Sequence, residues 1–247
     1  LFLCNYSPSQ KHSLQVLSLD GSVRLRCHCE FHTRSCINGL HCDSERQLLF
    51  IALTHSVQVT DLSGNKTRNI TAAFGCISGI DGDADRLFVF DSEKKTLHGI
   101  GKDTAEFHTT IDVSQFYGSG PGYLCSLSLR NNTILLPDTG NRAVHTVCID
   151  TKQLLSSHQF RCQRSQPRCV ACDSRGRMFI SDSGCHVVTV LQSDGTVLGT
   201  VGVHDEEGSD DTRFNGPCGL TVVETTAGCH LVVADCDNNR LRVFELL

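Results

Sequence analysis

The sequence predicts an all-β fold, a six-bladed β-propeller of four-stranded antiparallel blades, in one domain spanning residues 1–247. Three observations predict it. A unit of three short β patterns recurs along the chain, and each pattern is β-branched or alternating and bounded by turn residues. Aspartates return at roughly the 40 to 50 residue spacing of propeller blades. The sequence shows no amphipathic helix, heptad pattern or membrane-spanning apolar run.

The clearest copy of the unit is the stretch 216–244. It reads CGLTVVE, then HLVVADC after a glycine turn, then RLRVFEL after a polar run. Asp235 and either Asn238 or Asn239 suit a tight turn, because short side chains of this type bond nearby backbone amides and tolerate positive φ. We therefore expect three strands here, with the aspartate closing the second.

Four upstream stretches follow the same order, with weaker patterns toward the N-terminus. They cover residues 167–190, 124–147, 77–100 and 37–59. Their recurring aspartates are Asp91, Asp138 and Asp182, and the expected aspartate of the earliest copy is replaced near Leu53. The absence of Trp argues against the WD-type repeat.

The N-terminal 36 residues predict a sixth blade that lacks its innermost strand, because LFLCN matches LVVAD of the last copy. Blades are then expected to start near residues 1, 37, 77, 122, 167 and 217. The last blade stops without an outer strand, so open edges are expected unless residues upstream of Leu1 complete the ring. The chain begins with Leu rather than Met, which indicates a fragment of a longer protein.

The repeat resembles the NHL repeat. A GL or GV strand, a strand ending in Ala-Asp or Ser-Asp, a loop with Asn-Arg and a V-x-V strand carry the likeness, most clearly over residues 122–247. The linker FNGPCGL is similar to that family's usual junction between blades. Such propellers are best known as the C-terminal domain of tripartite-motif ubiquitin ligases (TRIM-NHL E3 enzymes). The resemblance implies a domain that selects a ubiquitination substrate or an RNA while a RING segment elsewhere does the enzymology.

Fifteen cysteines bear on the compartment. Most fall on strand positions that other copies fill with apolar residues, so packing of free, buried thiols is expected; they include Cys42, Cys125, Cys148, Cys169, Cys172 and Cys218. An odd count fits a full disulfide framework poorly, and this predicts a reducing, cytoplasmic location. Four Asn-x-Ser/Thr sequons favour the alternative of secretion, at Asn5, Asn65, Asn69 and Asn131.

No common catalytic or phosphate-binding motif is present, and we expect no cofactor, no metal and no catalytic residue in this domain. Ser183-Gly184-Cys185-His186 places a thiol beside an imidazole, but in the repeat it is the turn after Asp182. On the innermost strands His41 and Asp81 are the possible metal ligands, too few for a hydrolase or lyase centre. A secreted propeller enzyme is therefore a distant alternative.

What remains is a binding face. In an up-and-down blade, the turn between the second and third strands and the linker into the next blade emerge on one side of the disc. The basic candidates expected there are Lys94, Lys95, Arg142, Arg161, Arg164, Arg168, His186 and Arg240. An acidic rim is expected beside them from Asp205, Glu206, Glu207, Asp210 and Asp211. Arg142 and Arg240 recur in the repeat and have the alternative role of holding their own turns.

The partner is expected to be a protein. The net charge is −5, so the field of the whole molecule does not attract nucleic acid. Aromatic platforms for stacking bases are sparse on the expected face, where the candidates are Phe116, Tyr117 and Phe214. An RNA-binding domain with a basic face is the alternative. No membrane contact is expected, and oligomerisation would come from segments outside this chain.

Overall fold

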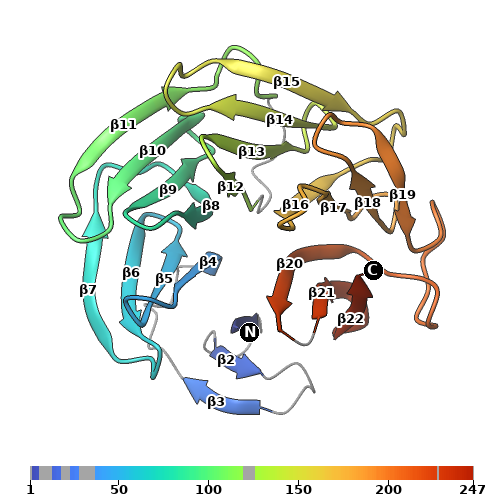
Figure 1. Cartoon of the computed structure of the whole chain (residues 1–247), viewed down its shortest axis with the longest axis horizontal. Helices are drawn as coiled ribbons and strands as arrows, with labels where there is room; N and C mark the ends of the chain where they lie inside the picture. The colour runs from blue at the N-terminus through green and yellow to red at the C-terminus, as the bar shows by residue number, and fades with distance from the viewer. Residues whose placement is uncertain are drawn as a thin grey trace. The chain divides into compact units, whose positions relative to one another are not determined.

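The computed structural model describes residues 2–5, 13–17, 23–27, 37–118, 126–226 and 228–246, and side chains in the last three of these ranges. The chain forms two compact units, Leu1–Thr110 and Ile111–Leu247. Every sheet is antiparallel and joins strands that are consecutive in sequence (Figure 1). The described residues contain a single short 3-10 turn, η1 (Cys236–Asn238), and no helix that could span a membrane.

The first unit begins with the three-stranded sheet β1 (Phe2–Asn5), β2 (Ser13–Leu17) and β3 (Val23–Cys27). The next sheet has four strands, β4 (Ile37–Asp43), β5 (Leu48–Leu53), β6 (Ser56–Asp61) and β7 (Lys66–Thr71). A second four-stranded sheet follows, with β8 (Ile77–Gly82), β9 (Arg86–Asp91), β10 (Thr96–Gly101) and β11 (Phe107–Asp112), whose last strand runs into the second unit.

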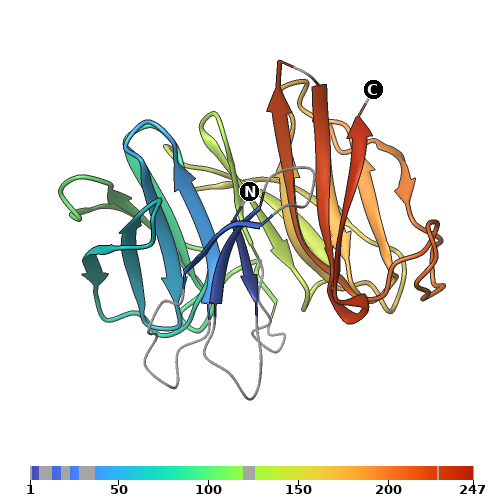
Figure 2. The ribbon, with the colours of Figure 1, turned by 90° about the horizontal axis from the view of Figure 1, so that it is seen from below.

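The second unit contains two more four-stranded sheets and a final sheet of three strands. The first comprises β12 (Ser128–Arg130), β13 (Thr133–Asp138), β14 (Ala143–Cys148) and β15 (Leu154–Gln159). The second comprises β16 (Pro167–Cys172), β17 (Met178–Asp182), β18 (Val187–Leu191) and β19 (Val197–Val201). The last has the long strands β20 (Pro217–Thr225), β21 (Gly228–Asp235) and β22 (Arg240–Leu246), which run side by side in Figure 2.

The strand registers confirm the repeat alignment. The first residue of β8, β16 and β20 pairs with the terminal aspartate of the next strand, in the pairs Ile77↔Asp91, Pro167↔Asp182 and Pro217↔Asp235. In β4 the equivalent pair is Ile37↔Leu53, at the position where the sequence lacks the aspartate. Each first strand then shifts register directly after that pair, so the four blades share a bulge as well as a sequence pattern.

The fold is thus an all-β propeller of four-stranded antiparallel blades, as predicted, but the predicted count of six is wrong. Five blades follow one another over Ile37–Leu246, four with four strands and the last with three, and the described N-terminal residues contribute the short three-stranded sheet β1-β2-β3. The sequence match of LFLCN and its neighbours located those three strands correctly. The prediction already gave this segment no innermost strand, and counting the incomplete segment as a blade made the total six. Cys125, predicted to pack on a strand, lies outside the described residues.

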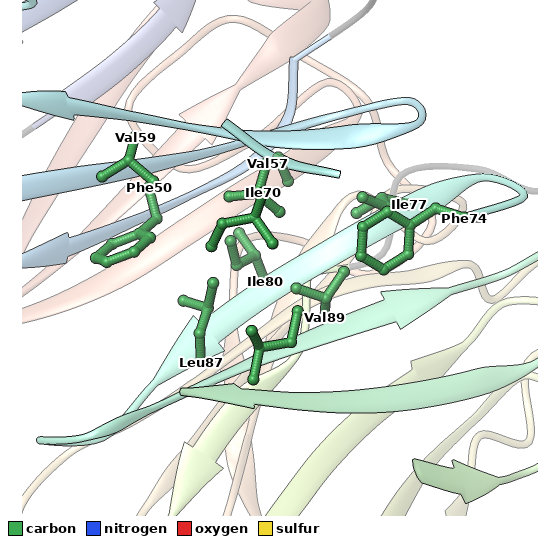
Figure 3. Close-up of a cluster of buried hydrophobic side chains, with 11 residues drawn as sticks. Phe50, Val57, Val59, Ile70, Phe74, Ile77, Ile80, Leu87 and Val89 are labelled. Atoms are coloured by element: carbon green, nitrogen blue, oxygen red, sulfur yellow. The ribbon is translucent and has the colours of Figure 1, made fainter. Parts of the chain in front are cut away.

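Within each unit the described core lies between successive sheets. Second strands are buried on both faces, so they read as continuous apolar runs; Leu87, Phe88, Val89 and Phe90 of β9 are all fully buried. Figure 3 shows Phe50, Val57 and Ile70 of one blade packed against Ile80, Leu87 and Val89 of the next. The outermost strands β7 and β11 alternate and carry polar residues, which is typical of an edge that must not pair with another chain.

The recurring aspartates join the linker that enters a blade to the turn after its second strand. Asp91 is fully buried and accepts hydrogen bonds from the backbone N–H groups of Gly75, Cys76 and Lys94, at 2.7, 3.1 and 3.1 Å. The first two donors belong to the linker that enters the blade, and the third to the turn after β9. One carboxylate therefore joins the linker to the turn, which confirms that both emerge on the same side.

The residue four positions after each aspartate lies in the left-handed region. Lys95, Arg142, His186 and Asn239 have φ of 51°, 53°, 57° and 52°. A side chain with a Cβ pays a steric cost of about 1–2 kcal/mol in this conformation. The turn geometry required by the aspartate outweighs this cost in four successive blades.

Replacing Arg142 by glycine should therefore raise the free energy of unfolding by about 0.5–1 kcal/mol, since glycine adopts positive φ freely but loses more entropy on folding. Arg142→Val should lower it, because a β-branched residue is a strong outlier there. Urea unfolding of both variants measures the difference. Equal midpoints for the glycine and valine variants would mean that this turn relaxes to another conformation.

Candidate functional site

The candidate site lies on the face of the second unit where linkers meet turns. Its segments are the linker 160–166 before β16, the turn 183–186 between β17 and β18, the linker 202–216 before β20, and η1. The turn and the first linker lie very close together. A Cβ on Gly184 would lie 1.8 Å from the carbonyl oxygen of Arg164, so only glycine fits beside that linker. Asp182 accepts hydrogen bonds from the backbone N–H groups of Gln166 and Cys185, at 2.8 and 3.0 Å.

Two of the predicted arginines are engaged within this face. Arg240 donates to the Asp235 carboxylate at 2.7 Å and to the backbone carbonyls of Ser209, Asp210 and Arg213, at 2.6, 2.9 and 3.1 Å. Arg164 pairs with Asp205 at 3.1 Å. The basic candidates and the acidic rim therefore interleave here rather than forming two separate patches.

Arg168 lines a pocket of about 340 Å³ between the blades β16–β19 and β20–β22. Its guanidinium donates through Nε to Ser183 Oγ at 3.0 Å and through Nη2 to Gln166 Oε1 at 3.2 Å. Across the pocket lie Gly216, Cys218, Cys236 and Asp237. This is a concave site with a held guanidinium on one wall and a carboxylate on the other.

The second wall contains a disulfide between Cys218 and Cys236, with Cα atoms 6.3 Å apart. This corrects the prediction that Cys218 is a free packing thiol. The prediction of mostly buried thiols is also wrong for the described free cysteines. Cys169 and Cys185 are buried, whereas Cys76, Cys148, Cys162, Cys172 and Cys229 are half-buried and Cys42 is exposed. The position of these cysteines on strands predicted that their side chains would be buried. Several of them lie near strand ends, where the side chain is partly exposed to solvent.

A group of potential metal ligands that sequence reasoning missed lies beside Arg164. The ligand atoms of Cys162, Cys185, His204 and Asp205 all lie within 4.8 Å of one another. The two Sγ atoms are 2.8 Å apart, and Cys162 Sγ lies 3.7 Å from Asp205 Oδ1. Burial raises the pKa of the Cys185 thiol, and the neighbouring Cys162 raises it further.

The thiol–imidazole pair noted in the sequence is not this group. His186 has left-handed backbone and its Nδ1 accepts a hydrogen bond from Gly216 N–H at 3.2 Å, so it bonds the next linker rather than Cys185. The imidazole near Cys185 is His204, 19 residues away in the chain. The repeat alignment contained a signal for this group. It places Cys162 and His204 in linkers and Cys185 in a turn, all on one face of the blade.

The other predicted face residues have varied surroundings. Lys94 and Lys95 belong to the first unit, where Lys94 Nζ donates to the carbonyl of Ala73. In the second unit Arg161 is exposed and Arg142 is half-buried. Arg213 pairs with Glu206 and Asp210 at 3.3 and 3.4 Å, while Glu207 is exposed and the backbone carbonyl of Asp211 accepts from Arg242.

The aromatic candidates do not form a stacking platform. Phe214 is fully buried, with the Arg242 guanidinium 4.8 Å from its ring centroid. Phe116 meets His145 edge to face, with centroids 5.2 Å apart, and the Tyr117 hydroxyl donates to the carbonyl of Pro137 at 3.1 Å. Phe214 is therefore not on the exposed face, because its side chain packs in a buried cluster with Phe179 and Leu231.

Two histidine–carboxylate pairs lie in the sheets, one in each unit. In the first unit His41 Nδ1 lies 2.9 Å from Asp81 Oδ1, and His41 Nε2 is buried with no hydrogen-bond partner among the described residues. In the second unit Asp138, His145 and Ser157 form a chain across β13, β14 and β15, with distances of 3.0 and 2.8 Å. His145 is 2% exposed and its two nitrogens are both engaged, so this chain joins strands and offers no substrate site.

The sequence matches no protein-family model and no curated protein. Among solved structures it is similar to a protein of unknown function from Bacteroides caccae, with a TM-score of 0.69 and 12% identity, covering 95% of this chain and 82% of that one. It is also similar to the hydrazine synthase of Kuenenia stuttgartiensis, with a TM-score of 0.58 and 16% identity, covering 83% of this chain and 57% of that one. At these identities the likeness concerns the fold alone. The class that can be stated is therefore an all-β propeller.

Proposed function

We propose that this domain recognises a protein partner through the face of its second unit, with the pocket beside Arg168 receiving an acidic side chain. The NHL-like repeat supports placing the domain among the substrate-selecting propellers of tripartite-motif ubiquitin ligases. The observation that carries the proposal is the pocket itself, which combines a guanidinium held by Ser183 and Gln166 with a wall that contains the Cys218–Cys236 disulfide.

The pocket suits one or two side chains of a peptide. A volume of about 340 Å³ is at the low end of small-molecule sites. A guanidinium whose position is fixed matches a carboxylate through paired hydrogen bonds. Asp237 on the opposite wall can accept from a peptide N–H or a lysine, so a segment with an acidic anchor next to a donor is the expected ligand.

RNA fits this face less well. Arg164 and Arg240 already bond Asp205, Asp235 and linker carbonyls, so little uncompensated positive charge is left for phosphates. Phe214 is buried, and single-strand readers depend on exposed aromatic platforms. The net charge of −5 also disfavours RNA binding, because the molecule as a whole repels phosphates.

Selection from a random peptide library on the immobilised domain tests the proposal. Selected peptides should share an Asp or Glu, and Arg168→Ala should weaken their binding about 30-fold or more, the effect of about 2 kcal/mol for truncating one partner of a hydrogen-bonded charge pair. The matched control is Arg175→Ala, which removes an exposed arginine at the other end of β16 and β17.

RNA binding is measured on the same proteins at low and high salt. Weak binding that Arg168→Ala leaves unchanged agrees with a protein partner. Tight binding with a steep salt dependence, lost on charge reversal at Arg161 and Arg164, would overturn the proposal in favour of RNA. Selected peptides without an acidic residue would also overturn it.

A further inference from the structure

We propose that Cys162, Cys185, His204 and Asp205 form a binding site for one zinc ion. Nothing in the proposed partner recognition requires this site, and it lies on different residues from the pocket beside Arg168. The four side chains offer two sulfurs, one nitrogen and one carboxylate oxygen, and these atoms lie within 4.8 Å of one another.

The spacing fits a small tetrahedral ion. With zinc–sulfur bonds of about 2.3 Å and zinc–nitrogen or zinc–oxygen bonds of about 2.0 Å, neighbouring ligand atoms are about 3.3–3.8 Å apart. The separation of Cys162 Sγ from Asp205 Oδ1 is 3.7 Å, and that of His204 Nδ1 from Asp205 Oδ2 is 3.3 Å. The two sulfurs, 2.8 Å apart, need to separate by about 1 Å to bind the ion.

The types of ligand atom indicate which metal the site would bind. Paired thiolates favour zinc over magnesium or calcium, which prefer oxygen ligands. Four protein ligands close the tetrahedron, so the site is structural rather than catalytic. Two thiolates, one carboxylate and a neutral imidazole leave the bound ion with one net negative charge, and the Arg164 guanidinium lies 3.1 Å from Asp205 Oδ1 to balance it.

The ligands come from three segments that the fold already holds in place. Cys162 lies in the linker before β16, Cys185 in the turn after β17, and His204 and Asp205 in the linker after β19. The Cys185 N–H donates to Asp182 at 3.0 Å, and the Asp205 N–H donates to the Cys185 carbonyl at 2.9 Å. A bound zinc would therefore cross-link two linkers and a turn of one blade.

The short distance between the sulfurs also permits a disulfide between Cys162 and Cys185, which would exclude zinc. The test therefore uses the whole chain purified under reducing conditions, loaded with zinc and freed of excess ion. Elemental analysis should give one zinc per chain. Replacement by Co²⁺ should give intense visible bands of a tetrahedral site, together with thiolate-to-cobalt charge transfer in the near ultraviolet.

Variants distinguish this site from adventitious metal. Cys162→Ser and His204→Ala both alter solvent-accessible ligands, so the fold should persist; each should weaken zinc by more than the roughly 10–100-fold expected for Arg164→Ala, which touches the ligand shell from outside. Cys229→Ser, at a half-buried free cysteine on β21, should bind zinc like the wild type. Reduced protein that retains no zinc, or zinc that the Cys162 and His204 variants hold as tightly as the wild type, would overturn the proposal.

Discussion

Lys102→Met should lower the free energy of unfolding by about 3–5 kcal/mol, the effect of removing one partner of a buried ion pair. Lys102 Nζ lies 2.8 Å from Asp43 Oδ2, and the two side chains are 2% and 5% exposed. The ammonium also lies 5.7 Å from the centroid of the Phe50 ring. Methionine keeps the stem packed but leaves the buried Asp43 carboxylate with the more distant Arg46 guanidinium, at 3.3 Å, in place of the ammonium. Urea unfolding measures the loss.

The loss of the Lys102 charge, rather than the change in side-chain shape, should cause the destabilisation. Adding Asp43→Leu to Lys102→Met removes both charges and should recover much of the lost stability, since apolar replacement of a whole buried pair is often neutral. Lys66→Met, at an exposed position on β7, should change the midpoint little. A double variant as unstable as Lys102→Met would indicate that packing around Lys102 dominates.

The pair also gives the first unit a defined acid sensitivity. Burial alone would raise the pKa of Asp43, but hydrogen bonds from Lys102 and from the Arg46 backbone outweigh it and lower the pKa from 3.8 to about 2. A depressed carboxyl pKa stabilises the folded state above the ordinary value, and this stabilisation is lost as pH falls from about 4 toward 2. The pH dependence of unfolding in that window should be shallower for Lys102→Met than for the wild type.

The turns of the fold could be predicted from sequence because their chemistry is local and repeated. Asp91, Asp138, Asp182 and Asp235 end second strands, and the residue four positions later lies in the left-handed region each time. Because the aspartate hydrogen-bonds to nearby backbone amides, it recurs at the same position of the sequence pattern in these four copies. The first described blade lacks that aspartate at Leu53, yet its register and bulge are kept, because strand pairing and burial suffice there.

The site could be predicted only in part, because its decisive contacts join residues far apart in the chain. Arg164 was assigned to a basic patch, but Asp205 neutralises it from 41 residues away. Cys162 and His204 lie in linkers whose course no periodic pattern specifies. Likewise, the ion pair between Asp43 and Lys102 joins residues 59 positions apart, and the other copies have no equivalent among the described residues.

The blade count failed for a related reason. Repeat counting included the N-terminal match as a sixth blade although the sequence offered only three of its strands, and the described residues there form only the three strands β1, β2 and β3. Strand identity is set by local alternation and turn residues, whereas completion of a blade depends on which segment is available to pair. The five copies aligned in sequence correspond to the five blades over Ile37–Leu246.

Asp138→Ala should lower the free energy of unfolding by about 3–5 kcal/mol, because it removes the shared acceptor of several donors at a fully buried position. The carboxylate accepts from Gly118 N–H at 2.7 Å, from the backbone N–H and side-chain amide of Asn141 at 3.0 and 2.9 Å, and from His145 Nε2 at 3.0 Å. Alanine would leave the His145 donor without a partner inside the blade and would release the linker that carries Gly118. Thermal and urea unfolding measure the loss.

Three comparisons identify the cause of that loss. Asp138→Asn keeps the size of the side chain and one acceptor, so it should destabilise less than Asp138→Ala, whereas Asp150→Ala, at an exposed turn, should be near neutral. His145→Leu together with Asp138→Leu removes donor and acceptor at once, and should cost less than the sum of the two single changes because the pair is coupled.

The stabilisation by Asp138 should also depend on pH. Burial opposes ionisation of Asp138, but the hydrogen bonds from His145 and from the Gly118 and Asn141 backbone lower its pKa below 3.8. Its contribution to the free energy of unfolding is therefore present above that value and fades as pH falls below it. If Asp138→Ala unfolds at the same urea concentration as Asp150→Ala, the aspartates that recur along this chain mark the turns without holding them.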